Sequence, residues 1–371
     1  LFVGSMTDRP HPHAVSVPAV FKAEPEDFVV HELEAPPRRP REGEEAEAPS
    51  PPDHLWLWVE KRDFTTPEAA RRIARALGLP ASAASWAGMK DRRAVTQQWI
   101  SVPGIEHDWQ SVELEGIRIE RAKTAVGKLR PGQLAGNRFA IVLREVPEDA
   151  LEGLSARLDQ LSAGMPNYFG DQRFGRDNLD VARRWIVDGG KAPRDRFQRK
   201  MVVSALQSEG FNQVLAERVR RGTMSVAMVG DRMKREDTGG LFLVDDAVEA
   251  QARVDRWEIS PTGPLFGKKM PKVEGEVRTL EDEFQTALGL TPDALRRMGK
   301  LGRGTRRPLR VRLDEPSLET PEPGQVRLKF GLPAGSYATE VLRALFGDGA
   351  QAATDGPSRQ TETLALDTAS Q

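Results

Sequence analysis

The order of the expected secondary structure is the feature that most constrains how this chain folds. Short strand patterns dominate as far as Val146, helical patterns and loops fill the middle, and a strand pattern returns at residues 326–332. Two consecutive domains would not divide the strand-rich sequence in this way. A segment inserted into one α+β domain explains the order, and a length of 371 residues leaves room for both parts.

Individual elements follow from periodicity and from end signals. Residues 55–59 alternate aliphatic and Trp side chains, which is typical of a strand. Thr65 or Thr66 caps a helix that has Pro67 in its first turn and ends at Gly78. The other expected strands are residues 21–34, 98–103, 117–122, 139–146 and 326–332. The other expected helices are residues 151–163, 180–187, 201–221, 280–288, 294–298 and 337–346.

Composition narrows the class of protein. The chain has no cysteine, which excludes disulfides and thiolate metal sites. It has no apolar run of about eighteen residues, so we expect no membrane span, and its first ten residues are too polar for a signal peptide. We expect a cytoplasmic protein with irregular or disordered termini at residues 1–19 and 348–371. Residues 35–53, rich in Pro and Glu, predict a mobile loop.

Asp91 is a lone carboxylate in the basic segment SWAGMKDRRAVTQQW. One interpretation is a surface ion pair with Arg92 or Arg93, worth about 0–1 kcal/mol. The other is a catalytic group, because nearby cations favour the ionised form of a carboxyl and an ionised carboxylate can act as nucleophile or general base. No neighbouring acids complete a metal cage, which disfavours magnesium chemistry. Three polar residues suited to sugar or base contacts follow: Thr96, Gln97 and Gln98.

Three further segments combine aromatic side chains with polar ones. Residues 134–144, LAGNRFAIVLR, indicate either a β-turn feeding a core ring or a base contact by Asn137 with stacking on Phe139, worth about 1–3 kcal/mol per base. Residues 166–175, PNYFGDQRFG, indicate either a domain junction or an RNA contact. Residues 330–346 place Tyr337 after a Gly-rich turn, which is typical of helix capping or of a phosphate site.

Residues 296–312, RRMGKLGRGTRRPLRVR, hold eight cations and no acid. They form either a solvated loop or a surface for an anion, and the RNA backbone is the natural anion. We therefore expect Arg303, Arg306 and Arg307, together with Arg92, to contact RNA phosphates.

Eight motifs in order resemble those of the TruD family of tRNA pseudouridine synthases. They are KAEPEDFVV, GMKDR with AVTQ, GNRF, PNYFG, QRFG, SALQS with FN, PTGPLFG and LPAGSYAT. The likeness runs from about residue 21 to residue 346. It implies a pseudouridine-synthase catalytic core at residues 20–163 and 312–347, with a mixed, mostly antiparallel sheet flanked by helices. An inserted α/β TRUD domain would occupy residues 164–311, and the two would hold a tRNA between them.

The resemblance also implies the reaction, the conversion of uridine 13 of certain tRNAs from an N-glycoside to a C-glycoside. Such an isomerase needs no redox cofactor and no metal, since the reaction involves no net redox change. Asp91 stands where the family has its catalytic aspartate, and Lys22 matches a basic residue near it. Substrate contacts are implied for four residues: Phe28, Asn137, Phe139 and Tyr337, the last at a position where many members have Phe. Whether Asp91 attacks the anomeric carbon or helps remove the adjacent ribose proton stays open.

Two other functions are compatible with parts of the pattern. An RNA-binding protein without chemistry explains every feature except the placement of Asp91. A glycosidase would need a second acid about 5–9 Å from Asp91, and no residue stands out for that role. The resemblance implies tRNA as the partner. We expect a monomer, because no heptad pattern predicts a coiled-coil dimer.

Overall fold

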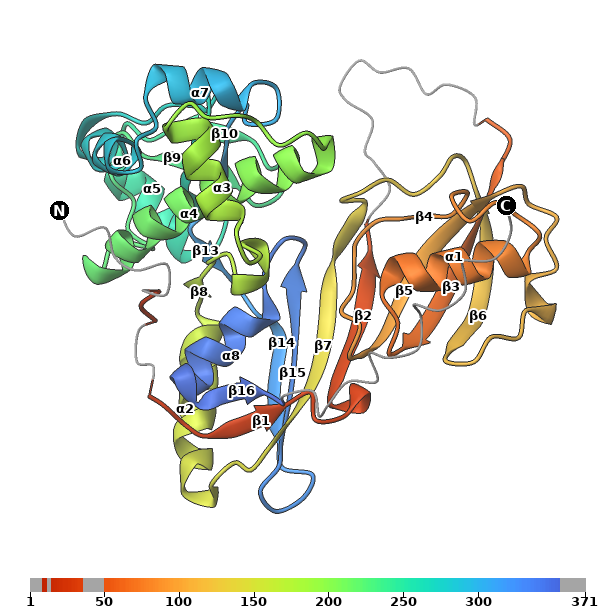
Figure 1. Ribbon diagram of the computed structural model, residues 1–371. Helices are drawn as coiled ribbons and strands as arrows, with labels where there is room; N and C mark the ends of the chain where they lie inside the picture. Colours follow the sequence, from red (N-terminus) through yellow and green to blue (C-terminus); the bar gives the residue numbers. More distant parts are fainter. Residues whose placement is uncertain (1–8, 12–14, 36–49, 354–371) are drawn as a thin grey trace.

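The computed structural model describes residues 9–11, 15–35 and 50–353, so most of the predicted loop at 35–53 and much of both termini lie outside the described residues. A large mixed sheet dominates (Figure 1). Its strand order is β14 (Asp314–Glu319), β15 (Val326–Pro333), β7 (Leu134–Arg144), β2 (Phe28–Glu34), β5 (Val95–Pro103), β3 (His54–Arg62) and β6 (Ile117–Ala125). Along this order only β2 and β5 pair in parallel, which confirms a mixed, mostly antiparallel sheet.

Two groups of helices cover the two ends of one face of this sheet. Directly opposed residues point to the same face, and one such row is Phe330, Phe139, Val30, Thr96 and Lys61. At the β15 end, α2 (Leu151–Ser162) and α8 (Ala338–Phe346) pack on this face. At the β3 end, α1 (Thr66–Ala76) packs on it. Strands β2 and β7 lie between the two groups (Figure 1).

The N-terminus of α1 forms as predicted. Thr65 is the N-cap, and its hydroxyl accepts a hydrogen bond from the Glu68 backbone N–H at 3.3 Å. The Glu68 carboxylate accepts in return from the Thr65 N–H at 2.8 Å. Substituting such a cap by Ala typically costs about 1 kcal/mol. The cap also fixes the neighbouring residue, Thr66, which contacts the loop that carries Asp91.

A second region leaves and rejoins the large sheet through paired segments. Strand β8 (Met165–Pro166) pairs antiparallel with β13 (Arg310–Val311), so the chain enters and exits side by side. Between them lies a four-stranded sheet ordered β10 (Leu241–Leu243), β9 (Arg232–Arg235), β11 (Ile259–Leu265) and β12 (Thr305–Pro308). Its helices are α3 (Asn178–Ala182), a π-helical turn at Arg183–Val187, α4 (Arg196–Arg220), α5 (Ala247–Asp255), α6 (Gly275–Ala287) and α7 (Pro292–Met298). We propose that residues 164–311 are an inserted domain and that residues 20–163 and 312–347 form the core.

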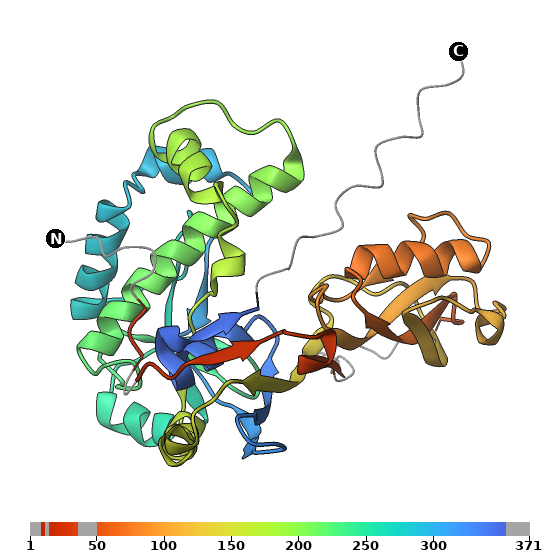
Figure 2. The ribbon, with the colours of Figure 1, turned by 60° about the horizontal axis from the view of Figure 1, so that its bottom comes forward.

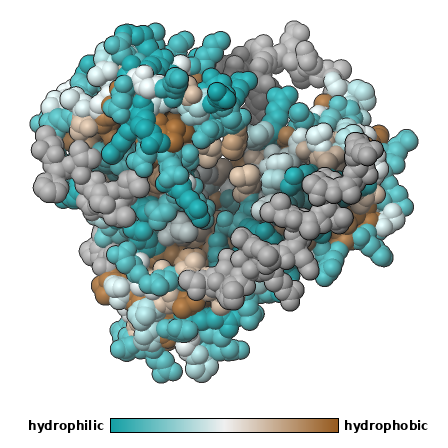
Figure 3. All heavy atoms as spheres, viewed as in Figure 1, coloured by the Kyte–Doolittle hydropathy of each residue, from teal (hydrophilic) through white to brown (hydrophobic). Residues whose placement is uncertain are grey.

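Figure 2 shows the α1 end of the large sheet standing apart from the second region. In space-filling form, hydrophilic residues dominate both parts and the surface recedes between them (Figure 3). None of the described helices is long and apolar enough to cross a bilayer.

The described parts of the two termini hold more structure than the sequence predicts. Strand β16 (Ala350–Ala352) pairs in parallel with β1 (Ala19–Phe21), so the expected irregular structure is wrong at these residues. Near the N-terminus, Arg9 is buried and its guanidinium lies 2.7 Å from Glu340 Oε1 on α8. Short segments such as Ala-Gln-Ala carry no strand pattern of their own, because their pairing depends on partners distant in sequence.

Candidate active site

Asp91 lies in the loop between the short strand β4 (Ser85–Trp86) and β5. Its Oδ2 accepts a hydrogen bond from Lys22 Nζ at 2.8 Å, and the two side chains are 34% and 13% exposed. The interpretation of Asp91 as a surface ion pair with a neighbour does not match these contacts. Arg92 lies 3.8 Å from Asp63, and Arg93 donates to the Ala23 carbonyl at 2.7 Å.

Lys22 is held in an unusual backbone conformation. Its φ of 58° lies in the left-handed region, which non-glycine residues rarely adopt. The side chain crosses the Phe28 ring, with Nζ 4.1 Å from the ring centroid. The aromatic face and the Asp91 carboxylate therefore both stabilise the ammonium in one position.

Lys61 lies on the other side of the loop and was not singled out by the sequence. Its side chain extends from β3 on the face that α1 covers, and the residue is 1% exposed. Nζ donates a 2.8 Å hydrogen bond to the backbone carbonyl of Asp91. Burial lowers the pKa of Lys61 to about 8, and the charge of Asp91 opposes this shift. The only feature of the sequence that indicates a buried role for Lys61 is its position in a strand whose other residues on that face are Leu and Val.

A buried polar network fixes the residues just before Asp91. Lys90 Nζ lies 2.5 Å from Glu32 Oε2, with both side chains almost fully buried. The Lys90 N–H donates to Thr66 Oγ1 at 2.9 Å, and that hydroxyl donates to Gln98 Oε1 at 2.8 Å. Gln98 Nε2 then donates to the Gly88 carbonyl at 3.0 Å. Elements β2, α1 and β5 thus hold the loop backbone together.

The polar residues that follow Asp91 are structural in these positions. Thr96 and Gln98 are fully buried in the sheet, so the expectation that they suit sugar or base contacts is not supported. Gln97 Oε1 accepts a hydrogen bond from His31 Nδ1 at 2.7 Å, and Gln97 Nε2 donates to Glu60 Oε2 at 2.9 Å. Alternation along β5 puts Gln97 on the sheet face opposite to Thr96 and Gln98.

Asn137 and Phe139 lie inside β7, between the two helix groups. The predicted turn at Gly136 and Asn137 is wrong, because both residues are already in the strand and pair with β15. Phe139 is half-buried, stacks on Phe330 at 5.3 Å between centroids and meets Phe28 edge-on at 6.2 Å. Asn137 Oδ1 is a buried acceptor without a partner among the described residues. Phe139 therefore has a packing role whatever else it contacts, whereas Asn137 keeps an unused acceptor.

Tyr337 belongs to a different cluster of side chains. It is the residue before α8, and its ring lies 6.0 Å from that of Phe169 at the junction with the second region. Burial raises the pKa of the Tyr337 hydroxyl. Lys22, Phe28 and Asp91 thus form one contact chain, and Tyr337 lies in another.

The basic run at residues 296–312 is only partly built into the fold, with four of its eight cations exposed and two, Arg306 and Arg310, buried. Arg306 is buried, with its guanidinium 2.5 Å from Glu281 and a further bond to Thr262 Oγ1 at 2.7 Å. Its predicted contact with RNA phosphates is wrong, since an arginine held in this way is not available to a ligand. Arg310 is buried over the Trp257 ring at 3.8 Å. Arg303 is exposed, and so is Arg92.

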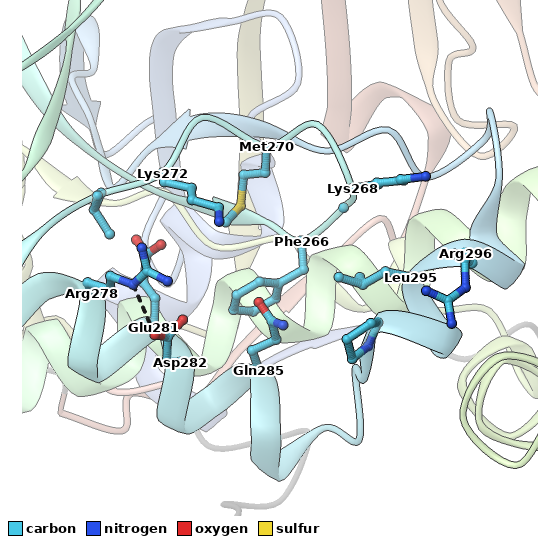
Figure 4. Close-up of a pocket in the computed structure, with 13 residues that line it drawn as sticks. Phe266, Lys268, Met270, Lys272, Arg278, Glu281, Asp282, Gln285, Leu295 and Arg296 are labelled. Atoms are coloured by element: carbon cyan, nitrogen blue, oxygen red, sulfur yellow. Dashed lines mark hydrogen bonds and ion pairs between the residues drawn. The ribbon is translucent and has the colours of Figure 1, made fainter.

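A cavity of about 270 Å³ lies in the second region, between α6, α7 and the loop after β11 (Figure 4). Phe266, Met270 and Leu295 line it, and cations such as Lys268 lie at its margin. The residues predicted from the sequence to form the site are not among those that line it, so it is separate from the cluster around Asp91.

Comparisons with known proteins show the family of this chain. The family model described as tRNA pseudouridine synthase D (TruD) matches residues 15–189 and 195–345. A tRNA pseudouridine synthase D of an Anaeromyxobacter species is 41% identical over 306 residues, which cover 80% of this chain and 86% of the relative. The Thermus thermophilus protein of the same name is 40% identical over 327 residues, 87% of each chain.

The fold is also found in a solved structure. The crystal structure of the protein assigned as tRNA pseudouridine synthase D in Methanosarcina mazei superposes with a TM-score of 0.69 at 23% identity, over 90% of this chain and 94% of that chain. This likeness shows the shared fold. Because the family model matches most of the residues and the relatives above match along most of their own length, the chain belongs to the tRNA pseudouridine synthase D family.

Proposed function

We propose that this protein converts uridine to pseudouridine at position 13 of tRNA, with Asp91 as the catalytic carboxylate. The observation that carries the proposal is that two lysines hold Asp91 in place, one at its carboxylate and one at its backbone carbonyl. Lys22 contacts its carboxylate at 2.8 Å, and the buried Lys61 contacts its backbone carbonyl at 2.8 Å. Preorganisation of this kind lets a carboxylate react without first being ordered.

The reaction is an isomerisation that exchanges one glycosidic bond for another. The bond between N1 of uracil and C1′ of ribose breaks, and a bond between C5 and C1′ forms. The proton lost from C5 is balanced by one gained at N1, so the atoms and electrons of the base are conserved. Asp91 either attacks C1′ or removes the neighbouring ribose proton. Lys22 stabilises the ionised carboxylate before the step.

The base must leave its stack to reach Asp91, and it must be held after its bond to ribose breaks. Asn137 has a buried Oδ1 without a partner among the described residues, and this acceptor would bind a uracil N–H once RNA binding exposes it. The half-buried Phe139 offers a ring for the base. Phe28 is only 2% exposed and lies beneath Lys22, so it supports Lys22 instead of making the substrate contact expected from the sequence. Tyr337 approaches from the junction side, and the exposed Arg92 and Arg303 contact RNA phosphates.

The test is carbodiimide mapping of pseudouridine in an unmodified tRNA transcript incubated with the purified protein. We expect a modification at position 13 that is absent from a transcript with cytidine there. Asp91→Asn should abolish turnover and retain tRNA binding. Asp63→Asn is the matched control, because Asp63 is exposed and pairs only loosely with Arg92 at 3.8 Å. Turnover by Asp91→Asn would refute the role of Asp91, and binding without modification by the wild type would favour an RNA-binding protein without chemistry.

A further inference from the structure

Two arginines contact the Phe169 ring at the junction between the two regions. Arg173 ends the short 3-10 helix Asp171–Arg173, and Arg307 lies in β12. Their guanidinium carbons lie 5.5 Å and 4.1 Å from the ring centroid. Both charges are therefore held beside one aromatic side chain, which limits the number of orientations they adopt.

The hydrogen bonds of these arginines leave several donors unused. Arg307 donates from Nε and Nη2 to the carbonyl and side-chain oxygens of Asn167, at 3.2 and 2.5 Å. Arg173 donates from Nε to Ser208 Oγ at 3.2 Å. Within the described ranges, Nη1 of Arg307 and both terminal nitrogens of Arg173 have no protein acceptor. Buried nitrogens that have no partner and are closed to solvent do occur in this structure, but these three are not among them. Solvent therefore reaches all three nitrogens.

The charges of Arg173 and Arg307 are also uncompensated. Three buried arginines of the described residues have carboxylate partners: Arg9 has Glu340 at 2.7 Å, Arg218 has Asp231 at 2.9 Å and Arg306 has Glu281 at 2.5 Å. The fourth, Arg310, donates to Ser260 and to two backbone carbonyls instead. In the part of the chain that the structure describes, no carboxylate lies within ion-pair distance of Arg173 or Arg307. Burial lowers the pKa of Arg307 to about 10; the charge of Tyr337 opposes this shift, and the charge of Arg173 adds to it. Arg307 still carries its charge at neutral pH, so an anion between the two guanidinium groups would relieve both desolvation and repulsion.

The site adjoins the residue proposed to approach the target base. The Phe169 ring that carries both arginines lies 6.0 Å from that of Tyr337. The turn before Tyr337 passes close to Arg307, because a Cβ at Gly335 would lie 3.5 Å from Arg307 Nη1. The free donors thus meet the loop that joins β15 to α8.

We propose that Arg173 and Arg307 form a phosphate-binding site that takes a phosphodiester of the RNA backbone next to the nucleotide at Tyr337. The ligand class follows from two guanidinium groups with free terminal donors, a geometry that suits phosphate oxygens. The assignment of the ligand to tRNA rests on the proposed function. The site fixes the backbone of the RNA and reads no base.

The test compares Arg173→Gln with Arg173→Lys and with Arg176→Gln, using a fluorescent unmodified tRNA transcript as the probe. Arg176 is an exposed arginine three residues farther along and serves as the charge-matched control. For Arg173→Gln we expect about a three- to tenfold weaker affinity and a salt dependence of log K reduced by about one unit. Arg173→Lys should retain most of the salt slope. KM should rise while kcat stays within about twofold, because the site acts on binding.

Thermal unfolding separates this role from a structural one. Removing one of two uncompensated like charges should leave the melting temperature of Arg173→Gln unchanged or raised. A clear fall in melting temperature, or an equal loss of affinity and slope in Arg176→Gln, would overturn the proposal. The binding experiment needs no turnover, so a wild-type protein that binds tRNA with the expected slopes but forms no pseudouridine would refute only the proposed function.

Discussion

The buried ammonium of Lys61 donates a hydrogen bond to the backbone carbonyl of Asp91, at 2.8 Å, from beneath the loop. Lys61→Met removes this bond and nearly preserves the side-chain length. We expect kcat to fall by about tenfold to a hundredfold, because misplacing a reacting group by about 1 Å costs rate on that scale. Affinity for tRNA should not change. Lys300→Met, at an exposed lysine, is the control, and equal activity of the two variants would show that Lys61 does not position Asp91.

The same lysine predicts how stability depends on pH. The folded pKa of Lys61 is about 8 and the value for a free side chain is 10.5. Between these values the unfolded state binds more protons, so this residue makes the free energy of unfolding rise with pH. The penalty for its buried charge is present below pH 8 and is relieved as the pH approaches 10.5. The unfolding free energy of the wild type should therefore rise relative to that of Lys61→Met, by up to about 1.4 kcal/mol per pH unit in this window. Urea denaturation of both proteins at several pH values measures this change. A flat difference would contradict the pKa shift.

Lys22 offers a test of the charge beside Asp91. Lys22→Gln keeps a donor but removes the charge that lies 2.8 Å from the carboxylate. We expect about a tenfold loss of kcat, since a partly exposed ion pair is worth on the order of 1 kcal/mol. Lys22→Arg should recover much of the loss. The comparison uses single-turnover rates on saturating tRNA. If Lys22→Arg were as slow as Lys22→Gln, the charge would not matter and Lys22 would have a packing role on Phe28.

Local patterns predicted much of the fold. The cap at Thr65, the alternation in β3 and the periodicity of α4 all depend on neighbours within a few residues, and each is found in the structure. Strand β12, Thr305–Pro308, was missed because its arginines mimic a polar loop. The burial of Arg306 depends on Glu281, 25 residues away, which no local pattern shows.

The same limit applies to the candidate site. Asp91 was identified from its neighbours and from the family motif. Its support by Lys61 depends on the register of β3 against β5, where Lys61 faces Thr96. The Glu32 and Lys90 pair joins residues 58 apart. Contacts of this kind follow from tertiary pairing, so the sequence predicted the reacting group but not its supports.

Asn137 and Phe139 should separate binding from packing. Phe139→Ala leaves a gap between Phe28 and Phe330, and we expect about 2–4 kcal/mol loss of stability. Asn137→Ala removes an acceptor that has no protein partner within the described residues, so its melting temperature should change little. Its turnover should nevertheless fall. Calorimetry and single-turnover rates on both variants make the test, and an unstable Asn137→Ala with normal turnover per folded molecule would remove Asn137 from the site.

Arg306 and Arg303 lie three residues apart and should behave in opposite ways. Arg306 is buried against Glu281, and breaking such a pair leaves an uncompensated charge at a cost of about 3–5 kcal/mol. Arg306→Gln should therefore unfold at a much lower temperature. Its tRNA affinity, measured well below that temperature, should be normal. Arg303 is exposed, so Arg303→Gln should keep wild-type stability and reduce the salt dependence of tRNA binding. If Arg306→Gln instead kept its stability and lost affinity, the buried ion pair would not be its role and the original expectation of an RNA contact would be restored.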